Sequence, residues 1–359
     1  MMIRNTIQQW AWRHAVALRA RVHDLTYFFW EATLRCNLGC QHCGSDCTRN
    51  AQTLDLPTER VLTVFRNIAE HYDPTKIVVA VTGGEALLRP DLFSIMEAVH
   101  GMGFRWGMVT NGMQMDERAV AACARSGMRT ISVSLDGLEA SHNWLRGHPQ
   151  SFRRAARALQ LLVQAGQFGG VEAITCVHSG NVGELEQIYQ LLREWGVHGW
   201  RIFTIFPQGR AAQHPELTLT RELLEQTLAF IADKRKTVPD WPISYSEEGY
   251  LGCDRELTVR DIRHYCGAGV HIGSLLADGS YSACPSLGRE WIQGHVDELP
   301  FSEAWETRYR NMRAREWMRN PTCGACRQWA NCQASSLHLW DWEARKPRVC
   351  HYRLLGEGE

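Results

Sequence analysis

Three cysteines lie close together near the amino terminus, and a fourth follows them. The stretch reads RCNLGCQHCGSDC (35–47), so that three and then two residues separate Cys36, Cys40 and Cys43, and Cys47 comes four residues later. Three thiolates from one loop can hold three corners of a cubane iron–sulfur cluster and leave the fourth iron open to a ligand. Structural zinc instead favours four protein ligands in paired short spacings. The spacing therefore favours an iron–sulfur site over zinc or unreactive thiols.

The composition limits the class of protein. The chain has 359 residues, is 45% apolar, and carries 39 basic and 39 acidic residues, so its formal net charge is zero and we expect no nucleic-acid partner. We see neither a signal peptide nor an apolar run long enough to predict a transmembrane segment. The thirteen cysteines are therefore expected to stay reduced in a cytoplasmic protein, where close spacing indicates metal binding or catalysis.

Strand-like and helix-like segments alternate over the first two thirds of the chain. Apolar runs predict strands at 26–32, 76–82, 104–110, 130–135, 170–177 and 200–206. Amphipathic periodicity predicts helices at 56–72, 89–102, 116–127, 151–166 and 181–196. This order is typical of a parallel sheet covered by helices, either an open sheet or a barrel. Functional loops of both architectures gather at the carboxyl ends of the strands, where the cysteine loop follows the first strand.

The C-x3-C-x2-C motif after the first strand resembles the radical S-adenosylmethionine (radical SAM) superfamily. Further motifs of that family follow strands two, three and four as TGGE, TNG and SLDG, and an arginine comes ten residues after the aspartate. The resemblance covers residues 26–235 and implies an α/β fold, a partial (β/α)6 TIM-like barrel. It assigns Cys36, Cys40 and Cys43 to the catalytic 4Fe-4S cluster. It assigns cofactor binding to Gly83, Gly84, Glu85, Thr110, Asn111, Ser134, Asp136 and Arg146.

The same resemblance implies a mechanism. S-adenosyl-L-methionine would bind the open iron, and an electron from the reduced cluster would cleave it to methionine and a 5'-deoxyadenosyl radical. That radical removes hydrogen from unactivated carbon, while the protein positions the reactants and excludes water.

The cysteines of the last third resemble the SPASM extension, which carries auxiliary clusters in radical SAM enzymes that mostly modify peptides or proteins. The resemblance implies that one auxiliary 4Fe-4S cluster is bound by Cys323, Cys326, Cys332 and Cys350. Ser336 and Ile272 stand where relatives have further ligands, so a second cluster would have only Cys266 and Cys284. Cys253 or His338 are candidates to complete that site, which is open, smaller or absent.

We expect four segments: an amino-terminal amphipathic helix (1–25), the radical SAM barrel (26–235), a bridging segment (236–265) and a loop-rich SPASM-like auxiliary cluster domain (266–359). The proline-rich, cysteine-rich final part looks too thin in core to fold without metal. We interpret Cys47, Cys123 and Cys176 as small buried residues. For Cys47 the alternative is a hydrogen donor or a substrate-linking thiol.

The expected function is an oxidoreductase that abstracts hydrogen from a peptide or protein substrate and gives an oxidative crosslink or a thioether. The alternatives are epimerisation and the maturation of another enzyme's cofactor. From another class, a non-catalytic iron–sulfur electron-transfer scaffold would keep the cysteines but would not need Glu85, Asp136 or Arg146. The expected partners are the substrate and an external electron donor such as a flavodoxin or ferredoxin. About twenty-five residues precede the first strand, so leader recognition would come from a separate protein.

Overall fold

A curved sheet forms the centre of the computed structural model, which describes residues 2–246 and 249–356. In this part of the chain the sheet has ten strands in the order β10-β9-β8-β1-β2-β3-β4-β5-β6-β7. The strands β1 to β7 are mutually parallel neighbours. Their bounds are β1 Tyr27–Glu31, β2 Val78–Thr82, β3 Arg105–Thr110, β4 Met128–Ser134, β5 Gly170–Val177, β6 Gly199–Thr204 and β7 Ile243–Tyr245. All six predicted strands are therefore present.

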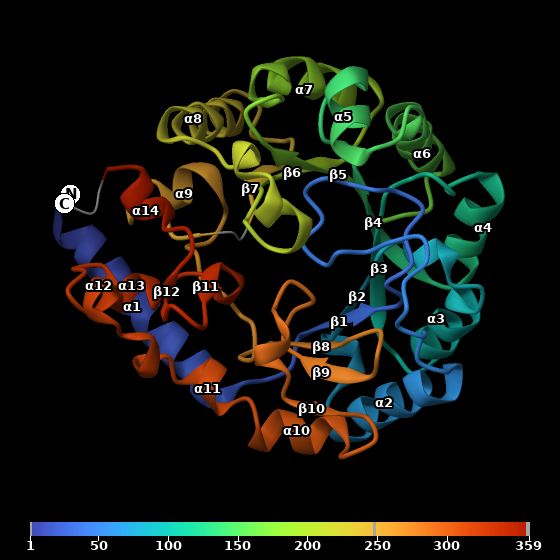
Figure 1. Cartoon of the computed structure of the whole chain (residues 1–359), viewed down its shortest axis with the longest axis horizontal. Helices are drawn as coiled ribbons and strands as arrows, with labels where there is room; N and C mark the ends of the chain where they lie inside the picture. The colour runs from blue at the N-terminus through green and yellow to red at the C-terminus, as the bar shows by residue number, and fades with distance from the viewer. Residues whose placement is uncertain (1, 247–248, 357–359) are drawn as a thin grey trace.

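Helices cover the outer face of this wall, and Figure 1 shows them arranged around the sheet from α2 in blue to α8 in yellow. They are α2 Thr58–His71, α3 Leu92–Gly101, α4 Glu117–Arg125, α5 Glu139–Arg146, α6 Ser151–Ala165, α7 Leu185–Glu194 and α8 Arg221–Thr237. Five of them match the predicted helices, whereas α5 and α8 were not predicted. The alternation of parallel strands and outer helices confirms the predicted partial barrel.

The two faces of the barrel strands differ in burial. Along β5, Val171, Ala173 and Val177 are fully buried against the helices, while Glu172 and Cys176, on the opposite face, are half-buried. Side chains of a strand alternate between its two faces. The half-buried set therefore lines the inside of the barrel, which is hollow rather than packed.

The chain after α8 returns to the barrel and adds to it. Strand β8 (Ile272–Leu275) pairs in parallel with β1, and β9 (Ser280–Ser282) and β10 (Gly294–His295) continue antiparallel. The short elements that follow are α10 Phe301–Thr307, α11 Arg310–Arg313, α12 Pro321–Gly324, α13 Trp329–Cys332, β11 Trp340–Asp341, β12 Lys346–Pro347 and α14 His351–Leu354. The division into four segments remains a prediction, and the sheet continues across its boundary at 236.

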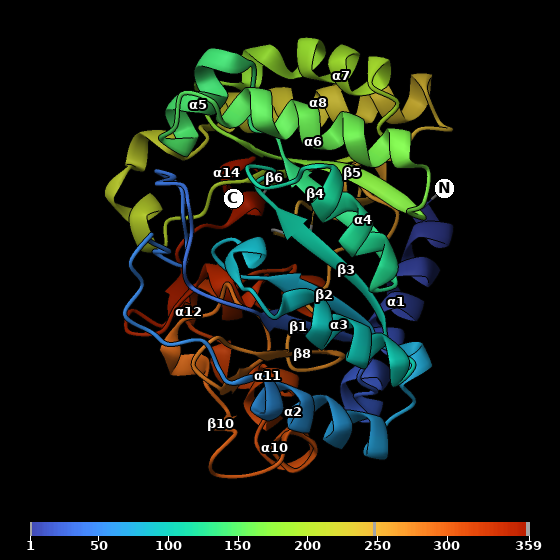
Figure 2. The same ribbon diagram turned by 90° about the vertical axis from the view of Figure 1, so that its right-hand side faces the viewer.

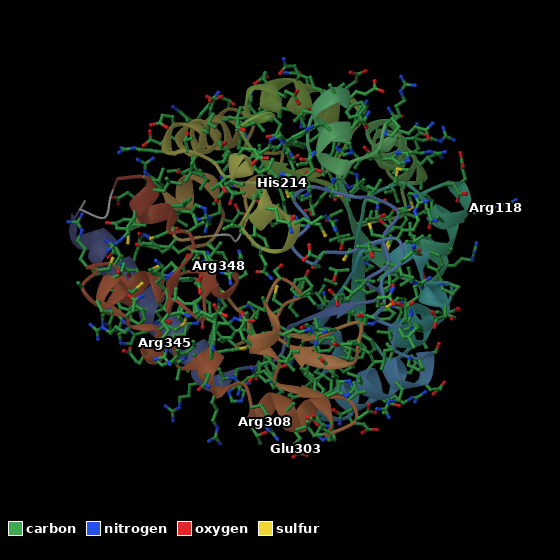
Figure 3. All side chains as sticks on the ribbon, in the orientation of Figure 1. Arg118, His214, Glu303, Arg308, Arg345 and Arg348 are labelled. Atoms are coloured by element: carbon green, nitrogen blue, oxygen red, sulfur yellow. The ribbon has the colours of Figure 1, made fainter. Side chains whose placement is uncertain are left out.

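The amino-terminal helix α1 (Met2–Val22) leads into β1 and lies beside α13, where Arg13 Nε donates to Asn331 Oδ1 at 2.8 Å. In Figure 2 the cysteine loop and α1 lie on opposite sides of the molecule. Charged side chains such as those of Arg118, Glu303 and Arg308 point outward at the rim in Figure 3. Among the described residues, no helix combines the length and the hydropathy needed to cross a bilayer.

Candidate active site

The cysteine loop leaves β1 and is held in place mainly by its backbone. The Cys36 amide donates to Thr48 O and the Gln41 amide to Leu145 O, both at 2.9 Å. Cys36 and Cys40 are 7% exposed, and Cys43 is half-buried. Burial raises the pKa of the Cys36 thiol to about 11 and also raises that of Cys40. Metal coordination requires thiolates, so these thiols are suited to be ionised by a bound cluster rather than by water.

The fourth cysteine of the loop is paired with the third. A hydrogen bond from the Cys47 thiol lowers the pKa of Cys43 to about 6, and the same contact raises the pKa of Cys47. Cys47 is 4% exposed, which fits its interpretation as a buried residue. Its thiol also reaches Ser45 O at 3.8 Å, so the buried thiol has a polar neighbour.

Two glycines bring the loop after β2 against the cysteine loop. A Cβ atom at Gly84 would lie 2.3 Å from Arg35 O and 3.0 Å from Cys36 Cβ. Gly83 has φ +143°, and a Cβ there would lie 2.5 Å from Thr33 O. Only glycine fits such a close approach of two backbones. The TGGE motif is therefore a structural requirement for placing Glu85 next to the cysteines.

Glu85 is buried and joined to the end of β3. Its Oε1 accepts from Thr110 Oγ1 and its Oε2 from the Asn111 amide, both at 2.8 Å. Burial raises the pKa of this carboxyl, and the hydrogen bonds from Asn111 and Thr110 only partly oppose it. A cationic amino group would stabilise the buried carboxylate. The site thus suits the amino group of S-adenosylmethionine, as the resemblance implies.

Asp136 and Arg146 form a buried ion pair beside the cysteine loop. Arg146 Nε lies 2.5 Å from Asp136 Oδ2, and Asp136 Oδ1 accepts from the Cys176 amide at 2.8 Å. Burial alone would raise the pKa of Asp136, but the Arg146 guanidinium holds it below its usual range. Asp136 comes directly after Ser134 and Leu135 at the end of β4, and Arg146 is the last residue of α5. The two predicted cofactor residues are therefore brought together, and within the described residues they pair with each other.

His42 and Cys176 were missed as site residues by sequence reasoning. Ligand atoms of His42, Asp136 and Cys176 all lie within 4.8 Å of one another. His42 Nδ1 has no hydrogen-bond partner in the described chain, and burial lowers the pKa of this imidazole to about 3. The interpretation of Cys176 as core is wrong, because it faces the hollow barrel, whereas Cys123 is fully buried as predicted. The alternation along β5 was the available signal for Cys176.

The loop after β6 clamps the cysteine loop. Arg210 Nε donates to Cys40 O at 2.8 Å and Arg210 Nη1 to Cys47 O at 3.0 Å. Gly209 has φ +58°, and a Cβ there would lie 2.5 Å from Cys43 O. This loop therefore fixes the backbone of the cysteine loop at Cys40, Cys43 and Cys47.

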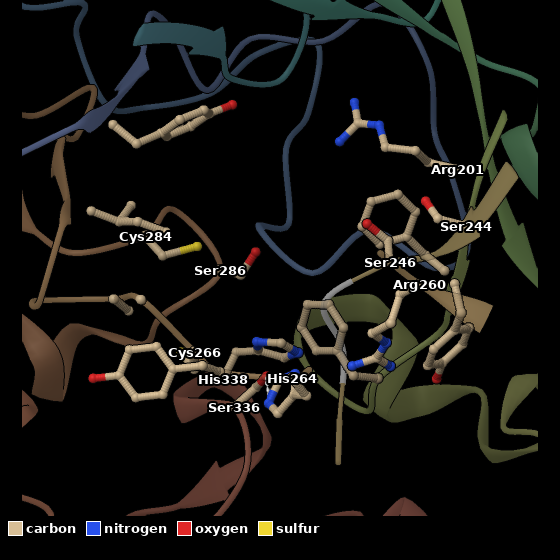
Figure 4. Close-up of a pocket in the computed structure, with 18 of the residues that line it drawn as sticks. Arg201, Ser244, Ser246, Arg260, His264, Cys266, Cys284, Ser286, Ser336 and His338 are labelled. Atoms are coloured by element: carbon tan, nitrogen blue, oxygen red, sulfur yellow. Dashed lines mark hydrogen bonds between the residues drawn. The ribbon is translucent and has the colours of Figure 1, made fainter. Parts of the chain in front are cut away.

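A cavity of about 740 Å³ runs from His42 and Cys176 through the barrel to the carboxyl-terminal segment. Its walls carry aromatic rings of the barrel strands and four imidazoles, those of His42, His264, His271 and His338. Figure 4 shows Cys266, His264, His338 and Ser336 together at one end, with Arg201 across the space. Such a volume holds a sizeable small molecule or a few residues of a peptide.

The two predicted auxiliary sets differ in their surroundings. The thiols of Cys323, Cys326, Cys332 and Cys350 line one separate cavity of about 580 Å³. Burial, and next the neighbouring Cys350 thiol, raise the pKa of Cys332 well above its usual value. Four cysteines around one cavity suit a fully ligated 4Fe-4S cluster.

Cys266 and Cys284 instead line the central cavity together with Ser336 and His338. Cys253 lies elsewhere, with its Sγ 3.0 Å from Tyr250 Oη and 3.3 Å from Asn331 Nδ2. Of the two candidates to complete this pair, the structure therefore places His338 beside it and Cys253 apart from it.

Comparison with known proteins agrees with this geometry. Residues 30–192 match the family model of the radical SAM superfamily. An AdoMet-dependent heme synthase of Oleidesulfovibrio alaskensis is 30% identical over 343 residues, which cover 90% of this chain and 86% of the relative. The mycofactocin maturase MftC of Mycobacterium ulcerans is 27% identical and covers 86% of this chain and 82% of the relative.

Among solved structures, anSMEcpe with bound AdoMet and the Cp18Cys peptide superposes with a TM-score of 0.71 at 17% identity. That match covers 93% of this chain and 95% of that one. At such low identity the likeness shows the fold.

Proposed function

The chain belongs to the radical SAM superfamily and is an enzyme, and from this premise we propose that it abstracts hydrogen from a carbon atom of a peptide or protein held in the central cavity. The observation that carries the proposal is the position of this cavity. Its walls include His42 and Cys176, so a substrate inside it would reach the buried motifs around the cysteine loop. A solved structure of the same fold holds a peptide, which supports this substrate class.

Membership of the superfamily implies a 4Fe-4S cluster and S-adenosylmethionine. We assign the cluster to Cys36, Cys40 and Cys43, because their burial and the two glycine contacts fit a compact ligand there. When bound, these groups supply the hydrogen-abstracting radical, which is the chemistry that side chains lack. Glu85 would hold the cofactor's amino group.

The ion pair of Asp136 and Arg146 keeps the site ordered. Asn181 Nδ2 donates to Asp136 O at 2.6 Å and to Cys176 O at 2.9 Å, and it thereby ties the ends of β4 and β5 together. Asp136 is completely buried and Arg146 nearly so, and water therefore has little access to the pair itself. Excluding water protects a reactive intermediate from side reactions.

The outcome we propose is a net oxidation that gives a crosslink or a thioether. The substrate would lose one hydrogen atom to the cofactor-derived radical, then one proton to solvent and one electron to an auxiliary cluster at Cys323, Cys326, Cys332 and Cys350. A fully ligated cluster suits electron transfer. Epimerisation would instead return a hydrogen atom and leave the product mass unchanged, so the product mass separates the two outcomes.

The lining of the cavity favours a second candidate substrate, an iron tetrapyrrole that carries carboxylates. Burial lowers the pKa of His338 and His271 to about 4, so both imidazoles are neutral, and neutral imidazole is a good iron ligand. Arg201 lies across the cavity from His338, where it pairs with Glu172 at 3.0 Å, and its guanidinium offers a positive charge to a carboxylate of the substrate. The relative named as a heme synthase points in the same direction.

The first experiment tests radical initiation. Anaerobically reconstituted protein with S-adenosylmethionine and a strong reductant should form 5'-deoxyadenosine, and a Cys40→Ala variant should form none. Cys123→Ala is the matched control, because it removes a buried thiol of helix α4 that is not part of the cysteine loop. Fully iron-loaded wild type that stays inactive with peptide and tetrapyrrole substrates would contradict the proposal.

A second experiment separates the two substrate classes. Iron coproporphyrin III is titrated into the protein, and its visible absorption is followed in the wild type and in His338→Ala. A spectral change that depends on His338 supports the tetrapyrrole. An unchanged spectrum leaves the peptide as the substrate class.

A further inference from the structure

The thiols of the cysteine loop have hydrogen-bond donors that come from other parts of the barrel. Asn111 Nδ2 lies 3.8 Å from Cys36 Sγ. Arg146 Nη1 lies 3.7 Å from Cys40 Sγ. Both distances are within the range of hydrogen bonds to sulfur, and both donors are buried in the protein. One donor follows β3 and the other ends α5, so two different elements contact two different thiols.

The third thiol has a donor from the loop itself. Cys47 packs with the other cysteines of the loop. Its thiol lies against the Cys43 sulfur and also reaches Ser45 O at 3.8 Å. The Cys47 thiol has one proton to donate. A ligating Cys43 is a thiolate that can only accept, and an ionised acceptor binds a donor more strongly than the Ser45 carbonyl, so we assign the proton of Cys47 to Cys43. The clamp by Arg210 on Cys47 O holds this donor in place.

Hydrogen bonds to the sulfur atoms of a cluster alter its electron affinity. Reduction adds one negative charge to the cluster and its thiolates, and a donated hydrogen bond stabilises that charge. The reduction potential of iron–sulfur clusters accordingly depends on such hydrogen bonds and on solvent exposure. A donor on every thiolate therefore favours the reduced state.

We propose that Asn111, Arg146 and Cys47 are positioning residues that donate one hydrogen bond to each of the three cluster thiolates and so raise the reduction potential of the cluster. The inference rests on the proposed assignment of the cluster to this loop. It gives Cys47 a role that neither a buried filler nor a substrate-linking thiol would have. It also gives Asn111 and Arg146 a contact with the cluster ligands in addition to their predicted contact with the cofactor.

Cys47 offers the sharpest test, because Cys47→Ala removes the side-chain hydrogen-bond donor whereas Cys47→Ser keeps one. The midpoint potential is measured by redox titration followed by electron paramagnetic resonance, and the relevant signal is the one that Cys40→Ala lacks. We expect Cys47→Ala to make the midpoint potential of the cluster more negative. The equilibrium constant for one-electron reduction should fall by up to about tenfold, which corresponds to a shift of about 59 mV. Cys47→Ser keeps a donor and should restore most of the shift, whereas Cys123→Ala should behave as wild type.

A purely structural role for Cys47 predicts a different pattern. Equal potentials for the wild type and an iron-loaded Cys47→Ala would overturn the inference, and so would equal shifts in the alanine and serine variants. If Cys47→Ala does not load iron, Asn111→Ala supplies the test, with Asn37→Ala as its control. Asn37 Oδ1 accepts from Asn111 Nδ2 at 2.8 Å. Asn37→Ala therefore removes this hydrogen bond but keeps Asn111 as the donor to Cys36 Sγ. Failure of the wild type to form the cluster would instead refute the proposed function.

Discussion

Replacing Gly84 by alanine should nearly abolish activity while leaving the protein folded. The added Cβ would lie 2.3 Å from Arg35 O, where ordinary contact begins at 3.4 Å, so the two backbones must separate by about 1 Å. Arg35 O also accepts from the Glu85 amide at 2.9 Å, and Cys36 is the next residue. The shift thus moves Glu85 relative to the cysteines. A misplacement of about 1 Å can cost about a hundredfold in rate, equivalent to about 2.7 kcal/mol in the barrier.

Gly84→Ala should change the thermal stability of the protein only slightly. Overpacking of this kind costs about 1–3 kcal/mol, which for 359 residues lowers Tm by only about 1–4 °C. The assay is the rate of 5'-deoxyadenosine formation, measured together with iron content and Tm. Gly101→Ala in α3, where nothing lies within 4 Å of the new Cβ, is the control. Activity of Gly84→Ala within twofold of the wild type would refute the reasoning.

Three further predictions concern other parts of the site. Arg210→Ala removes two hydrogen bonds to the cysteine loop and should lower the amount of iron bound after reconstitution. An unchanged iron content would show that the loop keeps its conformation without Arg210. A variant lacking all three cysteines of the loop should keep about four irons in one auxiliary cluster, and about eight would instead indicate two. Burial raises the pKa of Glu31 to about 7, so the folded state binds its proton more tightly than the unfolded chain and stability falls as pH rises from about 4.3 through 7. Glu31→Gln should remove up to about 4 kcal/mol of this loss at pH 8, and parallel pH profiles of wild type and variant in denaturant unfolding would contradict it.

Local sequence patterns were sufficient for the barrel and for its motifs. Strands and outer helices are defined by apolar periodicity within a few turns, and Gly84 and Asp136 each stand at a fixed offset from the end of a strand. The motifs therefore follow from positions that are near in sequence. The pairing of Asp136 with Arg146 also spans only ten residues.

Contacts between distant segments were not accessible in the same way. The pairing of β8 with β1 joins Tyr27 to Ile272, and nothing in a four-residue strand indicates which edge it will meet. In the sequence, His42 is simply a residue between two cysteines. Its neighbours in the site, Asp136 and Cys176, come from the end of β4 and from β5, so only the folded structure brings the three together. The separation of Cys253 from Cys266 likewise depends on how the carboxyl-terminal loops pack.

The pairing of β1 with β8 has a consequence for folding during synthesis. The edge of β1 that faces β8 stays unpaired until residues near 272 have left the ribosome, although β1 is among the first elements made. Such long-range pairing is slow, and an unpaired strand edge invites association with other chains. The cysteine loop follows that same strand, so the wall beside it stays incomplete until β8 has been made. Pairing of β8 with β1 would complete this side of the wall and remove the exposed edge.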